Sequence, residues 1–273
     1  MLKNIVVPLD SSSYSWSAAQ HAVKMAFPYR AAIHGLYVVD AKITEGQLLN
    51  DLNVDPEEAH DLYQAKGNKL LEKFEKECKG ANVEFHPVIA EGVVSRMIRD
   101  KATEFNAELI IMGKKGINAQ WSGPLFGSVA ETVVRQAKRP VFLAQENYSP
   151  IEAVYVAYDG ELVSIRALRF AAELCARCKW RMYVISVNRS EERQKELLQQ
   201  AVEMAELHGL KITTVGGSGD TTEEIMAAVS EDPNALIVLG AYSSRLRKLI
   251  LGSVSEQVMR QARQPVLVYR PLS

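Results

Sequence analysis

The amino-acid sequence predicts an α/β protein built from two doubly wound, Rossmann-like parallel sheets of five strands each, arranged as a tandem duplication. Two observations lead to this fold class. Strands such as 109–112 and 236–239 are apolar throughout, without the alternation of a sheet that faces water on one side. The chain also runs twice through one order of strands, helices and glycine turns. We therefore expect helices on both faces of each sheet.

Landmarks of the two copies recur in the same order along the chain, and their spacing falls after an insertion in the first copy. Two apolar runs end in an aspartate, and these residues, Asp10 and Asp159, lie 149 positions apart. Later landmarks recur after 127 or 125 positions: Gly92 with Gly219, Gly113 with Gly240, Gly127 with Gly252, and Pro140 with Pro265. A repeat of this length indicates a duplicated domain and not an array of short units. The predicted domains are 1–146 and 151–273.

Strand and helix signals alternate through the first copy. Serines 11–13 can cap the first helix, and Pro56 followed by two glutamates is typical of a helix start. The expected strands are 4–9, 32–39, 83–90, 108–112 and 141–144, and the expected helices are 14–26, 56–78, 95–105 and 129–136. Residues 40–55 are an insertion of this copy, either an ordered loop or a lid.

The second copy repeats this alternation. Its expected strands are 154–158, 182–187, 212–215, 236–239 and 266–269, and its expected helices are 164–178, 190–208, 222–230 and 254–263. The linker between the copies is 146–150.

Charge and composition exclude several classes of partner. The net charge of −1 gives no electrostatic argument for nucleic acid or an anionic membrane. No apolar run approaches the length of a membrane span, and the first ten residues form a short strand, not a signal peptide. The three cysteines do not pattern as a disulfide framework, so we expect a cytoplasmic protein. Cys175 and Cys178 have a redox or zinc spacing, but they lie inside a predicted helix, where core packing is favoured.

The marked residues fall at the carboxyl ends of predicted strands, where doubly wound sheets bind ligands. Gly113 and Gly240 follow the fourth strand of each copy, and Gly127 and Gly252 precede a helix. Glycines let the backbone approach an anion closely, and the first amides of a helix favour a phosphate. The strand-end aspartates can accept hydrogen bonds from a purine amine or from ribose hydroxyls. The alternative is that each Gly-Ser step only caps a helix.

Several motifs of catalysis and cofactor binding are absent from the sequence. It has no Gly-x-x-x-x-Gly-Lys-Ser/Thr, and no Gly-x-Gly-x-x-Gly follows the first strand, which argues against a P-loop ATPase and a nicotinamide site. It has no Gly-x-Ser-x-Gly nucleophile turn, and its five histidines lack ligand spacing. We therefore expect no catalytic residue and no metal site. The glycine-rich segment 216–219 is expected to be a plain turn.

These residues resemble the universal stress protein family, specifically its tandem two-domain members, over nearly the whole chain. The nucleotide-binding branch of that family carries Gly, two residues, Gly, nine residues, and then Gly before Ser or Thr, with a strand-end aspartate that contacts adenine. The resemblance implies an adenine nucleotide alpha hydrolase-like fold and ATP or AMP, with or without Mg²⁺, as the ligand. It implies two sets of binding residues: Pro8, Asp10, Val39, Met112, Gly113, Gly116, Gly127, Ser128 and Val129 in the first copy, and Ala157, Asp159, Val187, Leu239, Gly240, Ser243, Gly252, Ser253 and Val254 in the second.

Both copies depart from the family's spacing. Ten residues separate Gly116 from Gly127, one more than in the pattern. In the second copy Ser243 replaces the middle glycine, and eight residues separate it from Gly252. Because the first copy keeps all three loop glycines, retained binding is favoured there. Basic residues of the loops either face phosphates or lie in solvent: Lys114, Lys115, Arg245, Arg247 and Lys248.

The resemblance also implies how the copies combine and what they do. Family members pair through their last strands, so we expect 141–144 and 266–269 to pair antiparallel within the chain, with a further homodimer undecided. The leading hypothesis is an ATP- or AMP-binding sensor or adaptor of the stress response, whose nucleotide alters binding to an unidentified protein partner. The alternatives are a nucleotide-free scaffold of the same fold and, ranked last, an enzyme of slow ATP hydrolysis or adenylation.

Overall fold

The computed structural model describes residues 2–41, 55–117, 127–241 and 252–270, which form two compact units. Unit 1 comprises Met1–Gln136 and Glu146–Tyr148, and unit 2 comprises Ala137–Gln145 and Ser149–Ser273. Most of the insertion at 40–55 lies outside the described residues, so its prediction as a loop or a lid stays a prediction.

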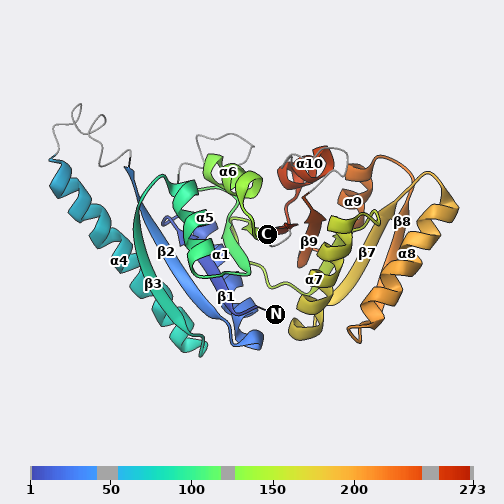
Figure 1. Cartoon of the computed structure of the whole chain (residues 1–273), viewed down its shortest axis with the longest axis horizontal. Helices are drawn as coiled ribbons and strands as arrows, with labels where there is room; N and C mark the ends of the chain where they lie inside the picture. The colour runs from blue at the N-terminus through green and yellow to red at the C-terminus, as the bar shows by residue number, and fades with distance from the viewer. Residues whose placement is uncertain (1, 42–54, 118–126, 242–251, 271–273) are drawn as a thin grey trace. The chain divides into compact units, whose positions relative to one another are not determined.

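Unit 1 holds a parallel sheet in the order β3-β2-β1-β4 (Figure 1). Its strands are β1 (Asn4–Leu9), β2 (Ala32–Asp40), β3 (Phe85–Gly92) and β4 (Leu109–Gly113). All five residues of β4 are buried, as expected for a strand covered on both faces. Parallel pairing aligns the carboxyl ends of these strands along one edge of the sheet.

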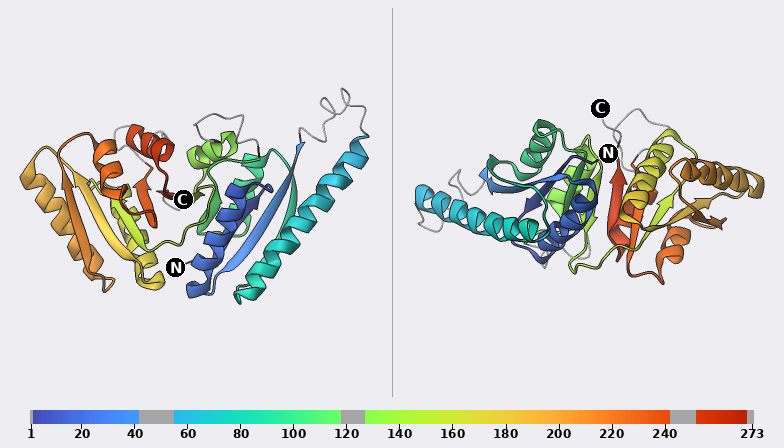
Figure 2. Two further views of the ribbon diagram at one scale, coloured as in Figure 1. Left: turned by 180° about the vertical axis from the view of Figure 1, so that it is seen from behind. Right: turned by 90° about the horizontal axis from the view of Figure 1, so that it is seen from below.

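Helices cover both faces of this sheet. They are α1 (Ser13–Ala26), which runs into the short 3₁₀ helix η1 (Phe27–Tyr29), α4 (Pro56–Gly80), α5 (Val94–Glu104) and α6 (Ser128–Gln136). One face carries α1 and α4, and the other carries α5, against which α6 packs (Figures 1 and 2). The close packing of α4 on β2 requires a glycine at position 67 of α4, because a Cβ on Gly67 would overlap the ring of Tyr37 on β2.

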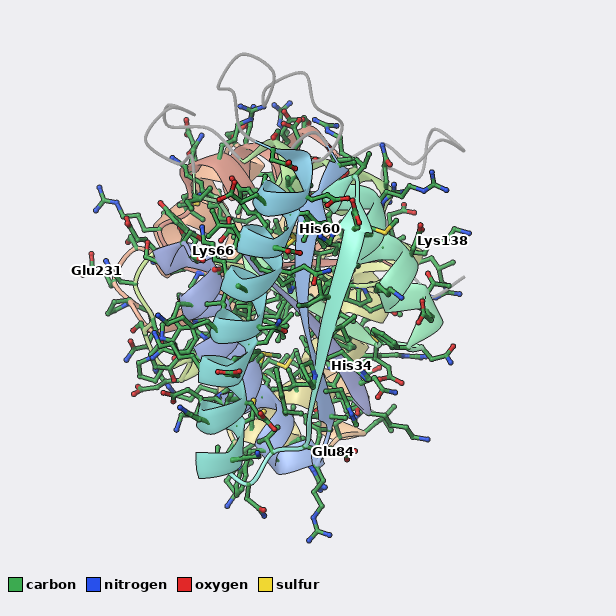
Figure 3. The ribbon with its side chains drawn as sticks, turned by 90° about the vertical axis from the view of Figure 1, so that its left-hand side faces the viewer. His34, His60, Lys66, Glu84, Lys138 and Glu231 are labelled. Carbon is green, nitrogen blue, oxygen red and sulfur yellow. The ribbon has the colours of Figure 1, made fainter. Side chains whose placement is uncertain are left out.

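A stack of rings lies near the amino ends of β2 and β3. His34 stacks on His86, with ring centroids 5.0 Å apart, and on Phe105 at 4.3 Å. His86 also contacts the carboxylate of Glu84, with Nε2 and Oε1 3.0 Å apart. Burial, followed by the nearby His86, lowers the pKa of His34. Figure 3 shows His34 and Glu84 toward the end of the sheet away from the arrowhead of β3.

Unit 2 holds a sheet in the order β5-β10-β9-β6-β7-β8, parallel except for β5. Its strands are β5 (Val141–Ala144), β6 (Ala153–Ala157), β7 (Arg181–Val187), β8 (Ile212–Gly217), β9 (Ala235–Gly240) and β10 (Val266–Tyr269). Its helices are α7 (Leu162–Cys178), α8 (Glu191–Glu206), α9 (Thr221–Val229) and α10 (Ser253–Gln261). One face carries α7 and α8, and the other carries α9 with α10 packed beside it (Figure 2).

The last strands of the two copies pair antiparallel within the chain. Phe142 on β5 lies opposite Leu267 on β10, and both side chains are completely buried. Beyond the strand, the Gln145 side chain donates to the backbone oxygens of Ala262 and Gln264, at 3.1 and 2.7 Å. The predicted pairing is confirmed, and β5, although encoded by the first copy, belongs to unit 2.

The predicted α/β fold class is confirmed, and the expected helices and strands are present with ends that shift by up to two residues. The short helix η1 was not predicted. No helix among the described residues is long and apolar enough to cross a membrane. The three thiols are free, and Cys175 and Cys178 lie inside α7, where burial raises the pKa of both.

A buried histidine makes unit 1 sensitive to acid. His21 on α1 is 2% exposed and packs against the Tyr148 ring, and burial lowers its pKa to about 4. The unfolded chain therefore binds a proton near pH 6.5 that the folded chain accepts only near pH 4. The free energy of unfolding is therefore unaffected by this group above pH 6.5. It decreases as the pH falls from 6.5 toward 4, because only the unfolded chain binds the proton in that range.

We predict that lowering the pH from 7 to 4.5 costs the wild-type protein about 2 kcal/mol more unfolding free energy than it costs His21→Gln. Urea denaturation at both pH values measures the difference. His208→Gln, at an exposed position, is the matched control and should behave as the wild type. Equal acid sensitivity of His21→Gln and the wild type would contradict the assignment.

Candidate functional site

The carboxylate of Asp10 organises the turn between β1 and α1. Its Oδ1 accepts hydrogen bonds from the backbone N–H of Ser12 at 3.0 Å and from the Ser12 hydroxyl at 2.6 Å. Ser12 in turn caps α1 by accepting from the N–H of Ser15 at 3.1 Å. Between them, Ser11 adopts a left-handed φ of 69°. Asp10 is therefore held at the strand end by the start of the next helix.

The second copy builds the same turn with different residues. Asp159 Oδ1 accepts from the N–H of Glu161 at 2.9 Å and from the Ser164 hydroxyl at 2.5 Å. Gly160, with φ of 79°, stands at the position of Ser11. Ser164 lies 149 positions after Ser15, so the hydroxyl that steadies each aspartate turn is also duplicated. The recurrence at that distance is the signal that could have identified Ser15 and Ser164 from the sequence.

The glycines that end β4 and β9 lie against the first turn of the helix that follows the first strand of each copy, α1 or α7. A Cβ on Gly113 would lie 2.7 Å from the Cβ of Tyr14 in α1. A Cβ on Gly240 would lie 3.2 Å from a methyl carbon of Val163 in α7, the counterpart of Tyr14. A Cβ is therefore excluded at Gly113, where backbone atoms also lie within 2.9 Å, whereas at Gly240 the neighbouring methyl group would have to shift by a few tenths of an ångström.

In the first copy, the loop after β4 returns to the aspartate. The N–H of Ile117 donates to Asp10 Oδ2 at 2.9 Å, and a Cβ on Gly116 would lie 2.7 Å from the same oxygen. At the other end of the loop, the N–H of Gly127 donates to the carbonyl of Lys114 at 3.1 Å. The structure thus brings Asp10, Gly113, Gly116 and Gly127 together at one strand edge.

In the second copy, Gly252 is the N-cap of α10, with extended backbone angles. No described residue lies within 4 Å of a Cβ built on it. The hydroxyl of Ser255, one turn inside α10, donates to the carbonyl of Gly240 at 3.1 Å and ties the helix to β9. Ser243 and the basic residues of this loop, Arg245, Arg247 and Lys248, lie outside the described residues.

The remaining predicted residues lie at the carboxyl ends of the strands or at the starts of α6 and α10, and their side chains differ in exposure. Met112, Val39 and Leu239 are buried at the ends of β4, β2 and β9, and they can only form the apolar base of a site. Those at least partly exposed are Pro8, Ser128, Val129, Ala157, Val187, Ser253 and Val254. Ser128 and Ser253 begin α6 and α10 and are well exposed, so their hydroxyls can meet a ligand.

Lys114 is a buried cation within the first loop. Only 6% of its surface is exposed, and burial, followed by the adjacent Lys115, lowers its pKa to about 8. Of the two alternatives for the basic residues, a position in solvent is wrong for Lys114, and a position that faces phosphate stays a prediction. Lys115, which is half-buried, is the more accessible of the two cations.

The glycine-rich segment 216–219 uses its amides internally. The N–H groups of Ser218 and Gly219 donate to the carboxylate of Glu224 in α9, at 3.3 and 2.9 Å. Gly216 and Gly217 are the last residues of β8, so the prediction of a plain turn over 216–219 is wrong for them, and only Ser218 and Gly219 lie between the strand and α9.

The family of this chain follows from comparison with known proteins. The family model described as "Universal stress protein family" matches residues 1–145 and again residues 150–270. The chain belongs to the universal stress protein family. Since the family model matches twice, this universal stress protein is a tandem two-domain member.

Relatives and solved structures agree with that assignment. Universal stress protein Slr1230 of Synechocystis sp. is 25% identical over 98% of this chain and 100% of its own length. Universal stress protein MJ0531 of Methanocaldococcus jannaschii is 32% identical over 54% of this chain and 84% of its own. The crystal structure of a universal stress protein from Archaeoglobus fulgidus superimposes with a TM-score of 0.81, at 23% identity and 98% coverage of both chains.

One related crystal structure is described as a universal stress protein in complex with cAMP. It covers 45% of this chain at 23% identity, with a TM-score of 0.39. That likeness is too small to bear on the ligand of this protein.

Burial of Lys114 predicts a stability that rises with pH. Because its pKa is about 8 in the folded state and near 10.5 in the unfolded state, the unfolded chain binds more protons between these values. We predict that raising the pH from 7 to 9.5 gives the wild type about 2 kcal/mol more unfolding free energy relative to Lys114→Met. Chemical denaturation at both pH values measures this, with the exposed Lys138→Met as the control. Parallel pH profiles of the wild type and Lys114→Met would contradict it.

Proposed function

We propose that this universal stress protein binds adenine nucleotide, ATP or AMP, at the carboxyl ends of its strands. The observation that carries the proposal is the duplicated arrangement of a helix-anchored aspartate beside a strand-end glycine and a Gly-Ser helix start. The aspartate oxygens would accept from the purine amine or the ribose. The amides at the starts of α6 and α10 would donate to phosphates.

The proposed role is that of a sensor or adaptor in the stress response, in which bound nucleotide alters contact with a protein partner. The serines beside the aspartates are engaged at the helix starts, which supports binding in preference to catalysis: Ser12 caps α1, and the hydroxyls of Ser15 and Ser164 donate to backbone carbonyls three residues before them. Among the described residues, no group of three or more His, Cys, Asp or Glu could hold a metal. Any Mg²⁺ would therefore be held largely by the phosphates of the nucleotide. Three free thiols support a reducing, cytoplasmic location.

A nucleotide-free scaffold is the second candidate. It is favoured by the hydrogen bonds of the first loop, which satisfy both Asp10 and the amide of Gly127 without a ligand. Mass spectrometry of the supernatant after heat release separates the two candidates. Adenine nucleotide released in a fixed ratio to protein would exclude the scaffold.

We predict that the wild-type protein binds ATP or AMP with an affinity of millimolar or better, and that Gly127→Leu combined with Gly252→Leu abolishes binding. Each leucine places a side chain where the phosphate must approach the helix start. Isothermal titration calorimetry measures binding, and circular dichroism confirms folding.

The matched control for these variants is Gly80→Leu, at an exposed position with no atom within 4 Å of its added Cβ. It should bind as the wild type does. Absence of binding by the wild type at millimolar ATP and AMP would refute the proposed function.

A further inference from the structure

The amino end of β3 is packed lightly against the sheet of unit 1. β3 stands at the end of the strand order with β2 as its neighbour, and every one of its residues keeps some exposure. Just before β3 begins, the carbonyl of Glu84 accepts from the N–H of Ile33 at 2.9 Å. On the face that carries α4, the Phe85 ring packs edge to face on Phe74, with centroids 5.1 Å apart. Lightly packed edges open at a lower free energy than the core does.

The opposite face of this strand end carries a pair of histidines. His34 on β2 and His86 on β3 are direct partners in the strand register, and their rings stack with centroids 5.0 Å apart and planes 23° apart. The Phe105 ring stacks on His34 at 4.3 Å, so His34 lies between two rings. We call the stacked His34 and His86 the clasp, because they join the edge strand to its neighbour.

Charged groups approach the clasp from β3 and from α5. Glu84, which lies near the same end of the sheet as His34 (Figure 3), has its Oε1 3.0 Å from the Nε2 of His86 and forms an ion pair when His86 is protonated. On the α5 side, the Lys101 ammonium lies 5.7 Å from the centroid of the Phe105 ring. Lys101 is itself paired with Glu104 at 2.8 Å.

On the β1 side, the neighbour of His34 is the neutral Asn4, whose Oδ1 lies 3.1 Å from His34 Nε2. Glu108 accepts from the backbone N–H of Asn4 at 2.8 Å. The described partners of His34 are two rings and an amide, and none of them carries a negative charge. A proton on His34 therefore adds a cation 5.0 Å from His86 without a counter-ion of its own.

Acid favours a state in which the clasp is open. Burial, followed by the nearby His86, lowers the pKa of His34, whereas Glu84 opposes the shift. An open clasp leaves His34 in water, where its pKa takes the ordinary value near 6.5. Because the open state binds the proton more readily, its population rises as the pH falls below 6.5.

The second copy provides an internal comparison. Tyr183 lies 149 positions after His34 and Thr213 lies 127 positions after His86, and these two residues are again direct partners in the register. Tyr183 stacks on Tyr155, with centroids 4.4 Å apart. A stacked ring is thus present at this position in both copies, but only the first copy pairs it with a second group that titrates near neutral pH.

We propose that His34 and His86 form an acid-sensitive clasp, which holds the amino end of β3 on β2 at neutral pH and releases it when both rings are charged. The clasp lies at the amino ends of the strands, whereas the candidate nucleotide sites lie at the carboxyl ends. The inference therefore goes beyond the proposed function and does not depend on it. Release of β3 exposes the backbone edge of β2, which gives unit 1 a conformational response to acid.

The decisive variant is His34→Tyr, which installs the residue that the second copy carries at this position. Hydrogen exchange of the Ile33 amide, followed by NMR and expressed as a protection factor, reports opening of its bond to the Glu84 carbonyl. Protection is measured at pH 7 and at pH 5. His208→Tyr, at an exposed position of unit 2, is the matched control. His21 is present in all three proteins, so its own titration cancels in the comparison.

The expected result is that protection of the Ile33 amide falls about tenfold more between pH 7 and pH 5 in the wild type and in His208→Tyr than in His34→Tyr. The amide of Arg181, which donates to the carbonyl of Glu152 at 2.9 Å in unit 2, should show no such difference between the proteins. Equal losses of Ile33 protection in the wild type and in His34→Tyr overturn the clasp.

A second measurement needs no substitution. NMR titration of the wild type follows the ring protons of His34 and His86 from pH 8 to pH 4.5. Because stacked rings repel each other when both are charged, each curve should show two steps, and Ile33 protection should fall as His34 titrates. Independent single-step curves, or Ile33 protection that stays constant while His34 titrates, overturn the clasp even where His34→Tyr fails to fold.

Discussion

Burial of the central strands on both faces is the constraint on which this structure depends. Strands such as β4 and β9 contain only apolar residues and glycine, and their backbone polar groups must be satisfied within the sheet. Parallel pairing does this, but each connection must then return along a helix to the same end of the sheet. Within each unit the parallel strands therefore deliver their carboxyl ends to one edge of the sheet, which carries Asp10 in unit 1 and Asp159 in unit 2.

The duplication preserved the order of strands and helices, but side chains at corresponding positions of the two copies differ. Tyr37 on β2 lies in register with Leu9, the last residue of β1. At the corresponding positions of the second copy, Tyr158 follows β6 and Ser186 lies on β7, so the aromatic ring has moved to the neighbouring strand. All four are buried. The exchange keeps an aromatic ring at this level of the sheet, next to the aspartate turn.

The strand β5 shows why sequence copies and compact units need not coincide. It is the fifth strand of the first copy, yet its residues pair with β10 and cluster with unit 2. Four consecutive buried residues would expose a long apolar edge in the absence of a partner. Antiparallel pairing with the equivalent strand of the second copy removes that edge. The sheet of unit 2 therefore contains strands encoded by both copies.

The sequence by itself determined the fold class, the order of the elements and the location of the candidate site. Uninterrupted apolar runs, capping residues and turn glycines are local signals, and they mark buried strands, helix starts and turns directly. The site residues could be placed at one edge because parallel strands must end together.

The tertiary structure alone decided how the loop glycines are used. Gly116 and Gly127 suggest an anion site when read along the chain, but in space they let residues 114–117 contact Asp10 and the start of α6. That contact joins positions 107 residues apart, so it does not follow from a local pattern.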